Sequence, residues 1–226
     1  MKAPSKSKAR APRKPKHPDD DHVYCMLPAI GGASVFKEYR PDHRKSSLVV
    51  IRLERGEILT PEELADFPRE LAFQPNKGGI VPDVFCWTTG PYIVTRQFRE
   101  WLEELEPGRH AFHPIKVWSS RPIKGVTDHG TYYLILNPPE IDAIIPEGTI
   151  FWGGGTGPEE IRPDGSFALS SVGDSACYIK RQAVEGHHLW LLKGAGRQYM
   201  FSAELLRRYM MHKLRGLRIK NHCLLK

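Results

Sequence analysis

A glycine-rich segment, "GGGTG" at residues 153–157, is the first candidate for chemistry in this sequence, because such loops bind phosphate in many proteins. A P-loop also requires Lys and then Ser or Thr after its last glycine, and a dinucleotide-binding loop requires a third glycine where this sequence has Pro158. Glu159 and Glu160 would occupy the first turn of any helix that follows, where carboxylates oppose a bound phosphate. We therefore interpret the segment as a surface loop, and we expect no bound cofactor.

The same loop has the residue types of a protein-binding surface. Trp152 stands at its tip, and four acidic residues lie close to it in the sequence: Glu159, Glu160, Asp164 and Asp174. An exposed aromatic side chain among charges is typical of protein interfaces, although most tryptophans are largely buried. We predict that these five residues form a contact surface for a protein partner. An ordinary flexible loop with a buried Trp152 is the alternative.

A serine nucleophile is the second candidate. Ser175 follows Gly173 and Asp174, which resembles the nucleophile segment of Gly-Asp-Ser esterases, but those enzymes also need a late Asp-x-x-His pair that the closing "KNHCLLK" lacks. His187 or His188 could act as the base only if the fold brings one of them to Ser175. A serine hydrolase is therefore the weakest functional alternative. We expect that the protein is not an enzyme and has no catalytic residues.

Metal-binding residue types are present, but their spacing matches no known ligand set. The cysteines form no CxxC pair, and the adjacent His187 and His188 would point to opposite faces of a strand. A mixed zinc site would require the two ends of the chain to meet, because its ligands would be His22, Cys25, His222 and Cys223. We expect no metal site. We also expect reduced, buried thiols at all four cysteines: Cys25, Cys86, Cys177 and Cys223.

The net charge of +7 belongs to the ends of the chain. After Met1, residues 1–21 contain only Lys, Arg, Pro, Ala, Ser, His and Asp, so we expect a disordered basic tail with nothing to bury. Residues 193–226 have nine Lys or Arg residues against Glu204 alone, which leaves residues 17–192 with a formal charge of about −8. The middle of the chain is therefore acidic.

Nucleic-acid binding is the main alternative function. Residues 1–18 would make weak, salt-dependent contacts with nucleic acid. A C-terminal basic face would add six cations: Arg207, Arg208, Lys213, Arg215, Arg218 and Lys220. No recognition helix, RNP sequence or zinc finger surrounds this face, and a solvated helix surface is its commoner meaning. No hydrophobic signal region or membrane-length apolar run is present, so we expect a cytoplasmic protein without membrane contact.

The apolar patterns predict an α+β fold, in which mixed or antiparallel sheets combine with a few short amphipathic helices. Strands are predicted over residues 23–27, 47–53, 92–94, 131–137, 167–172, 176–179, 189–192 and 198–201. A short helix is predicted after Thr60, where Pro61 takes the first helical position and Glu63 completes a capping box. Pro114 predicts that the strand near it lies at a sheet edge or begins after the proline.

One order of elements occurs twice. Thr95 follows a strand and is expected to cap a helix. The apolar stripe of that helix consists of Phe98, Trp101, Leu102 and Leu105. Ser202 is expected to cap a second helix in the same way, with Gly216 at its C′ position. The stripe of the second helix consists of Leu206, Met210 and Leu214. The repeat predicts two related lobes, residues 22–118 and 119–226, within a domain of residues 22–226.

Several apolar segments together resemble a known family. In order, they are "GEIL" at Gly56, "PDVF" at Pro82, "YIVTRQFREWLEEL", "HPIKV", "YYLILNPPEIDAI", "HHLWLLKGAGRQYMFSAELLRRYM" and "LRGLRIKN". Over about residues 22–226 the sequence resembles the eleventh immunity-protein family of bacterial polymorphic toxin systems. The shared positions are those expected to build the core, so the resemblance transfers no functional residue.

This resemblance implies a cytoplasmic α+β protein that binds a cognate toxin and neutralises it stoichiometrically. The toxin gene is usually adjacent, and such systems, including those that use type VI secretion, serve bacterial competition. The acidic middle of the chain would suit a toxin with a basic, nucleic-acid-cleaving cleft, because complementary charge speeds association. We therefore expect the acidic residues around Trp152 to contact the toxin.

Overall fold

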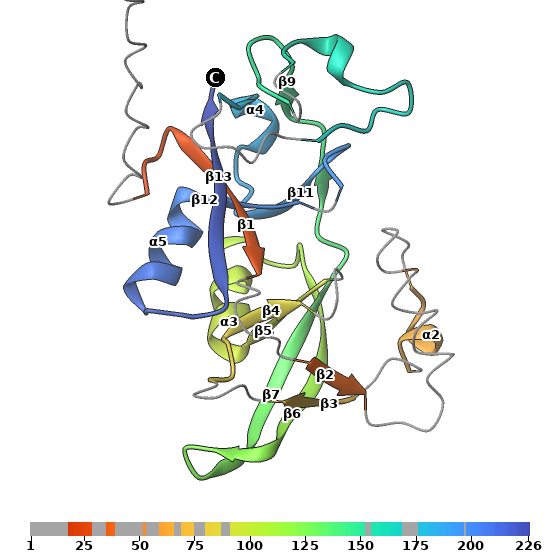
Figure 1. The fold of residues 1–226 in the computed structure, drawn as a ribbon, viewed down its shortest axis with the longest axis vertical. Helices are drawn as coiled ribbons and strands as arrows, with labels where there is room; N and C mark the ends of the chain where they lie inside the picture. Colours follow the sequence, from red (N-terminus) through yellow and green to blue (C-terminus); the bar gives the residue numbers. More distant parts are fainter. Residues whose placement is uncertain are drawn as a thin grey trace, which may run out of the picture.

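The computed structural model describes residues 18–28, 35–38, 52, 59–65, 69–74, 80–86, 91–151, 155–168, 176–196 and 198–226. Most of the predicted tail, residues 1–21, lies outside these ranges. So does most of the strand predicted over residues 47–53, of which only Arg52 is described, in a helical conformation. Of the strand predicted over residues 167–172, the first two residues are described and are not in a strand. The described elements confirm an α+β fold with mixed sheets (Figure 1).

Sheet A fills the upper half of Figure 1 and has the strand order β8-β11-β12-β1-β13-β10-β9. Its strands are β1 His22–Pro28, β8 Glu140–Ile141, β9 Ile144–Ile145, β10 Tyr178–Ile179, β11 Leu189–Leu192, β12 Tyr199–Ser202 and β13 Leu217–Leu225. The two edge strands, β8 and β9, are separated in the chain only by Asp142 and Ala143. One short segment therefore pairs with both edges and closes sheet A into a ring of strands.

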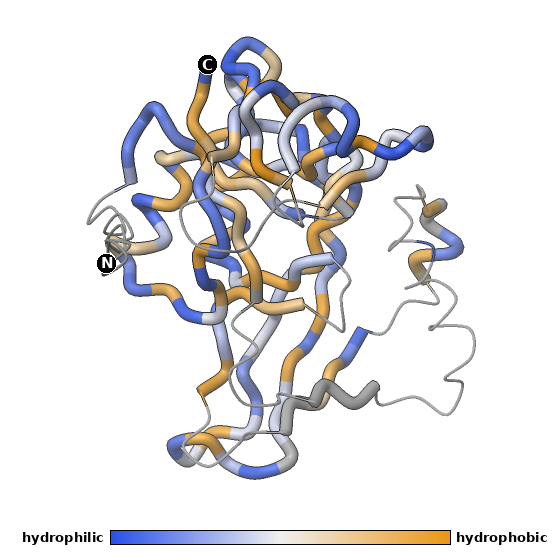
Figure 2. The backbone as a smooth tube through the Cα atoms, turned by 45° about the horizontal axis from the view of Figure 1, so that its top comes forward, coloured by the Kyte–Doolittle hydropathy of each residue, from blue (hydrophilic) through white to orange (hydrophobic). Residues whose placement is uncertain are grey.

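Strands of sheet A bury side chains on both faces. Val23 and Cys25 of β1 belong to the core inside the ring, whereas Tyr24 and Met26 of the same strand belong to a second core outside it. Because alternate residues of a strand point to opposite faces, such a strand must be apolar throughout. This explains the continuous apolar run that predicted β1. Figure 2 shows hydrophobic segments running through the interior and hydrophilic ones in the outer loops.

A disulfide joins Cys177 to Cys223 inside the ring, where their Cα atoms lie 4.5 Å apart. The prediction of reduced thiols is therefore wrong for this pair. The two cysteines are 46 residues apart in the sequence, and the parallel pairing of β10 with β13 brings them together. Cys25 and Cys86 are not part of a disulfide. Cys25 is buried as predicted, and burial raises the pKa of its thiol to about 11.

Removing this disulfide is expected to lower the free energy of unfolding by about 3 kcal/mol, because a cross-link that closes a long loop restricts the unfolded chain. Thermal unfolding before and after reduction measures the loss, and mass spectrometry after alkylation establishes that the bond is open. A Cys177→Ala/Cys223→Ala double variant is the control, since a reductant should not change its Tm. An equal Tm for the oxidised and reduced wild-type protein would contradict this prediction.

Sheet B fills the lower half of Figure 1 and has the strand order β2-β3-β6-β7-β5-β4. Its strands are β2 Val35–Glu38, β3 Glu70–Gln74, β4 Val84–Cys86, β5 Tyr92–Thr95, β6 Ala111–Ile123 and β7 Val126–Leu136. The long hairpin of β6 and β7 forms its centre and turns at Lys124 and Gly125, which have φ angles of 50° and 81°. β7 confirms the strand predicted over residues 131–137.

Pro114 lies inside β6, which is an interior strand, so the prediction of an edge or a start at the proline is wrong. The described part of β3 begins at Glu70, opposite Lys116 of β6. Lys116 N donates to Arg69 O (2.7 Å), and Pro114, two residues earlier, faces the same side. No described β3 residue pairs with Pro114, so its missing N–H breaks no bond of the β3–β6 ladder.

The two repeated units pack against each other between the sheets. α3 Arg96–Leu105 follows β5, and α5 Ala203–Met211 follows β12. The first residues of these strands, Tyr92 and Tyr199, stack with ring centroids 3.9 Å apart. The shared core also contains the helix residues Phe98, Trp101, Leu102, Leu205, Leu206 and Tyr209. The repeated order of elements is therefore present, whereas the division into two lobes stays a prediction, and its boundary at residue 118 would fall inside β6.

Helix starts follow the predictions in two of three cases. In α2 Pro61–Ala65, Glu63 N donates to Thr60 Oγ1 (3.2 Å) and Thr60 N donates to Glu63 Oε2 (2.9 Å), which confirms the capping box. Ser202 Oγ accepts from Leu205 N (3.1 Å) and caps α5 as predicted. Thr95 stands at the N-cap of α3, but its hydroxyl accepts no capping bond. Its Oγ1 is buried with no hydrogen-bond partner in the described part of the chain.

α5 ends before Gly216, so the prediction of this glycine as its C′ residue is wrong. Leu214 N donates to Tyr209 O (3.1 Å) and Lys213 N donates to Met210 O (3.0 Å). This pair of bonds is a Schellman motif, and it makes Lys213 the C′ residue, with a φ of 54°. The motif closes the helix three residues earlier than the glycine pattern indicated.

Met210 is also not a core residue. Met210 is 43% exposed, and the buried face of α5 consists of Ala203, Leu205, Leu206 and Tyr209. The predicted stripe is confirmed at Leu206, which is buried, and at Leu214, which packs against the core, and it is wrong only at Met210. A four-residue recurrence drifts from the 3.6-residue repeat of an α-helix. The exposed end of α5 therefore presents apolar surface.

Candidate functional site

The acidic loop, residues 155–168, is anchored to the ring by aromatic side chains. Phe151 precedes it and Phe167 lies near its end, and both are buried with ring centroids 5.5 Å apart. Phe167 N donates to Gly194 O (2.8 Å), which ties the end of the loop to the β11–β12 turn. Figure 1 shows this segment in teal at the top, on the end of the molecule opposite the β6–β7 turn.

Three predicted contact residues lie on this loop. Glu159 and Glu160 belong to the short 3-10 helix η1 Pro158–Glu160, and Asp164 lies in the following turn. Glu159 and Asp164 are exposed and Glu160 is half-buried. Hydrogen bonds from Ser166, one of them from its N–H to Asp164 Oδ1 (2.9 Å), hold the pKa of Asp164 below its usual range.

The carboxylates of the acidic loop outnumber its one cation, Arg162, whose charge helps to lower the pKa of Asp164. Within the described ranges, none of the three carboxylates forms an ion pair with a Lys, Arg or His side chain. Trp152 and Asp174, the other two predicted contact residues, lie outside the described residues. The structure therefore brings Glu159, Glu160 and Asp164 together on one loop.

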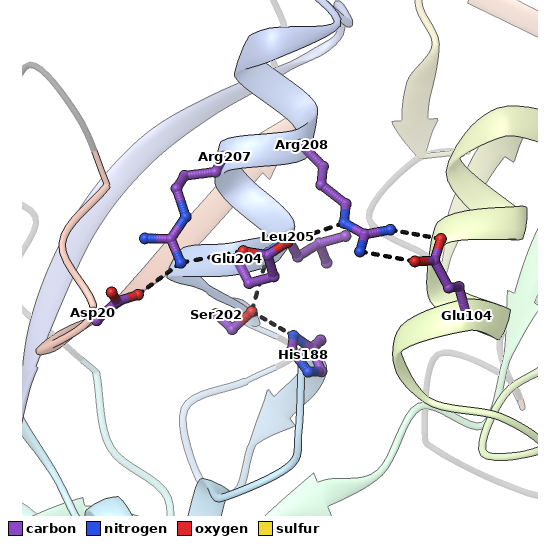
Figure 3. A network of polar contacts seen from close by, with 8 residues as sticks. All are labelled: Asp20, Glu104, His188, Ser202, Glu204, Leu205, Arg207 and Arg208. Atoms are coloured by element: carbon purple, nitrogen blue, oxygen red, sulfur yellow. Dashed lines mark hydrogen bonds and ion pairs between the residues drawn. The ribbon is translucent and has the colours of Figure 1, made fainter.

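The C-terminal basic face is partly neutralised. Arg207 pairs with Asp20 (2.7 Å) and Glu204 (3.2 Å). Arg208 pairs with Glu204 (3.1 Å) and makes two bonds to Glu104 of α3 (2.7 and 3.0 Å) (Figure 3). These two arginines hold the N-terminal segment and α3 against α5, so they act in the fold. Their pairing weakens the case for a nucleic-acid-binding face.

A serine–histidine pair exists, but it is not the predicted one. Ser175 lies outside the described residues. His188 Nδ1 lies 2.9 Å from the hydroxyl of Ser202, as Figure 3 shows. That hydroxyl also accepts Leu205 N at the start of α5, so the pair belongs to a helix cap rather than to an activated nucleophile.

The two ends of the described chain do meet, because β1 pairs with β13. The rings of His22 and His222 lie 5.3 Å apart at this junction. The remaining residues of the proposed zinc set do not join them, since Cys223 is in the disulfide and Cys25 Sγ donates to Gln198 Oε1 (3.2 Å). Among the described residues, no group of three or more His, Cys, Asp or Glu side chains could hold a metal ion.

A buried cluster around the carboxylate of Glu106 was not predicted from the sequence. Glu106, at the end of α3, is 2% exposed, and its Oε2 accepts His110 Nε2 (2.8 Å) and Leu189 N (2.9 Å). Its Oε1 lies 3.5 Å from His187 Nδ1 and 3.9 Å from an Arg109 nitrogen. Burial raises the pKa of Glu106, but the bonds from His110 and from backbone N–H groups outweigh burial and hold it below its usual range. The cluster therefore joins the end of α3 to the start of β11.

Acidification is expected to destabilise this region. Burial lowers the pKa of both His187 and His188, so the unfolded chain binds protons at these imidazoles more readily than the folded protein does. Their stabilising contribution is complete above the usual histidine pKa of about 6.5 and is lost as the pH falls through the lowered values. Tm should therefore fall between about pH 7.5 and about pH 5.

A His187→Gln/His188→Gln double variant provides the control for this pH dependence. Its Tm should fall less steeply than that of the wild-type protein over the same range, because the two depressed titrations are absent. Equal slopes for the two proteins would show that these histidines do not cause the effect.

The chain matches the model of the immunity protein family Imm11 over residues 35–222. This range includes all of sheet B and every strand of sheet A except β1 and the last residues of β13. The chain belongs to the Imm11 immunity protein family. The comparison with curated proteins found no match.

Membership of the Imm11 family confirms the predicted resemblance and makes this an immunity protein. It implies a non-enzymatic role, and it implies a toxin as partner. β1 lies before the matched range although it is a central strand of sheet A, between β12 and β13. No helix in the described part of this Imm11 protein is long and apolar enough to span a membrane.

Proposed function

We propose that this protein binds a cognate bacterial toxin, encoded by a neighbouring gene, and neutralises it by stoichiometric protein–protein interaction in the cytoplasm. The observation that carries the proposal is the Imm11 match over residues 35–222. The system would serve bacterial competition, with the toxin delivered by type VI secretion. The Cys177–Cys223 disulfide is unusual for a cytoplasmic protein, because cytoplasmic thiol systems keep most cysteines reduced.

We propose the acidic loop as the toxin contact. Glu159, Glu160 and Asp164 extend from a loop whose two ends are fixed by buried phenylalanines, so the charges have a defined position. Carboxylates without ion-pair partners attract a basic surface and speed its association. In the sequence, Trp152 lies shortly before the acidic loop and Asp174 shortly after it. We propose that these two residues complete the contact surface.

Charge reversal tests this contact. A Glu159→Lys/Glu160→Lys/Asp164→Lys variant should bind the product of the neighbouring gene more weakly than the wild-type protein, with a flatter dependence of Kd on salt. Isothermal titration calorimetry at several ionic strengths measures both quantities. Survival of cells that co-express the toxin with this variant should also be reduced.

The matched control reverses three exposed carboxylates elsewhere: Glu62, Glu100 and Glu185. It changes the net charge by the same amount and should leave Kd close to the wild-type value. An unchanged Kd in the acidic-loop variant would reject the loop as the contact. Equal weakening in both variants would show a general effect of net charge instead.

Weak nucleic-acid contact through residues 1–18 is proposed only as an accessory property. It predicts retention of the protein on DNA or RNA at low salt and its loss when those residues are deleted. Retention that survives the deletion would place any such contact elsewhere.

A further inference from the structure

A second surface of mixed apolar and basic character lies at the end of α5. We define this α5-end surface by Met210, Met211, Lys213, Arg215 and Arg218. Met210 is 43% and Met211 76% exposed, and both are among the large hydrophobic side chains most exposed in the described chain. The three cations are exposed, and none pairs with a carboxylate in the described ranges. Arg207 and Arg208, one turn earlier, are neutralised.

The backbone of Lys213 fixes where α5 ends and this surface begins. Lys213 occupies the C′ position of α5 with a φ of 54°, where glycine is favoured because a Cβ is strained. Lys124 in the β6–β7 turn has a similar φ of 50°, so the positive φ marks the end of α5 and does not by itself assign a function to Lys213. A function for this surface is supported instead by its exposed methionines and by its cations, which form no ion pair in the described ranges.

The surface rests on a rigid support. The ring of His212 lies 4.8 Å from the ring of Trp101 and its Nδ1 lies 3.2 Å from Gln97 Nε2. Both partners belong to α3, so the last turn of α5 is held against its neighbour. Rigid presentation lowers the entropy that a partner must overcome on binding.

We propose that the α5-end surface docks an acidic face of the cognate toxin that has an apolar centre. This inference rests on the proposed function, which supplies the protein partner, and the charge of that face follows from complementarity with Lys213, Arg215 and Arg218. Exposed methionines adapt to apolar partner surfaces and therefore favour a protein partner, whereas proteins that bind single-stranded nucleic acid combine their cations with aromatic side chains for stacking. The toxin thus meets two separate contacts of opposite charge.

The Lys213→Gly variant separates binding from folding. Glycine relieves the positive φ, so Tm should rise by a few degrees. The binding partner in this assay is a catalytically inactivated variant of the product of the neighbouring gene. The loss of a complementary charge should raise its Kd by roughly fivefold relative to the wild-type immunity protein. Met211→Asp should raise this Kd by roughly tenfold or more, because it places a carboxylate opposite the acidic face. Calorimetry measures Kd, and thermal unfolding measures Tm.

Lys124→Gly is the matched control. Lys124 is also exposed and also has a positive φ, of 50°, but it lies in the β6–β7 turn of sheet B. Its replacement should raise Tm in the same way and leave Kd unchanged.

Four outcomes are decisive. Weaker toxin binding by Lys213→Gly and Met211→Asp, with Lys124→Gly unchanged, supports the docking surface. Wild-type affinity in both α5-end variants overturns it while the proposed function stands. Absence of binding by the wild-type protein rejects the proposed function, and the docking surface with it. Loss of oligonucleotide binding in the same variants, with toxin affinity unchanged, would assign the surface to nucleic acid and overturn the inference.

Discussion

Replacement of Gly216 by alanine is expected to destabilise the protein by about 4 kcal/mol, which corresponds to a fall in Tm of roughly 12 °C. Gly216 has a φ of 114°, and a Cβ there would lie 2.7 Å from Pro82 Cβ and 2.9 Å from the carbonyl carbon of Val84. The neighbouring backbone cannot move away, because Val84 N and Asp83 N both donate to Arg215 O (3.0 and 2.8 Å). The added methyl group would therefore separate the start of β13 from β4. Thermal unfolding measures the effect.

Gly125→Ala controls for backbone strain alone. Gly125 has a φ of 81°, but a Cβ there would meet no atom within 4 Å. Its replacement should cost about 1 kcal/mol, the strain of an alanine at positive φ. Equal Tm values for Gly216→Ala and Gly125→Ala would show that the close contact with β4 is not the reason why position 216 requires glycine.

Replacement of Glu106 by alanine is expected to cost about 3–5 kcal/mol, because removing one partner of a buried charged cluster leaves the others unsatisfied. The side chain of Glu106 is 0% exposed, and its loss would strand the Leu189 N–H and the buried His110. Glu106→Gln should cost less, since its amide can still accept from Leu189 N and contact His110. Chemical denaturation measures the three free energies.

Glu103→Ala is the control for this series. Glu103 pairs with Arg99 at 2.9 Å on the exposed face of the same helix. Exposed pairs of this kind contribute little, so the expected change is within about 0.5 kcal/mol. A Glu106→Ala variant as stable as Glu103→Ala would contradict the assigned role of the buried carboxylate.

Elements set by local patterns were predictable from the sequence. Thr60 and Glu63 form their capping box, Ser202 caps its helix, and the apolar stripe of α3 is buried at Phe98, Trp101 and Leu102. Each of these features depends on residues a few positions apart, so sequence spacing determines the geometry directly.

Features that depend on strand pairing were not predictable. Cys177 and Cys223 meet only because β10 runs beside β13, and Pro114 fits inside β6 at a position where no described residue of β3 pairs with it. The cluster around Glu106 had a local signal in a histidine four residues later, but its other hydrogen-bond partner, Leu189, comes from another part of the chain. No local sequence pattern predicts that Leu189 lies beside Glu106.

The candidate site was predictable in part. The sequence identified Glu159, Glu160 and Asp164 from their charge, and the structure places all three on one anchored loop. The α5-end surface was hidden, because Met210 fits a core pattern and Lys213 fits a solvated helix face. Only the structure shows that Met210 is exposed and that Lys213 follows the end of α5 at the C′ position.

The most direct test of the account is to mix this protein with the purified product of the neighbouring gene and to measure complex stoichiometry and toxin activity together. Native mass spectrometry should show a one-to-one complex, and toxin activity should fall in proportion to added protein and vanish at equivalence. Full toxin activity in the presence of excess protein, with no complex at about 10 μM, would contradict the proposed function.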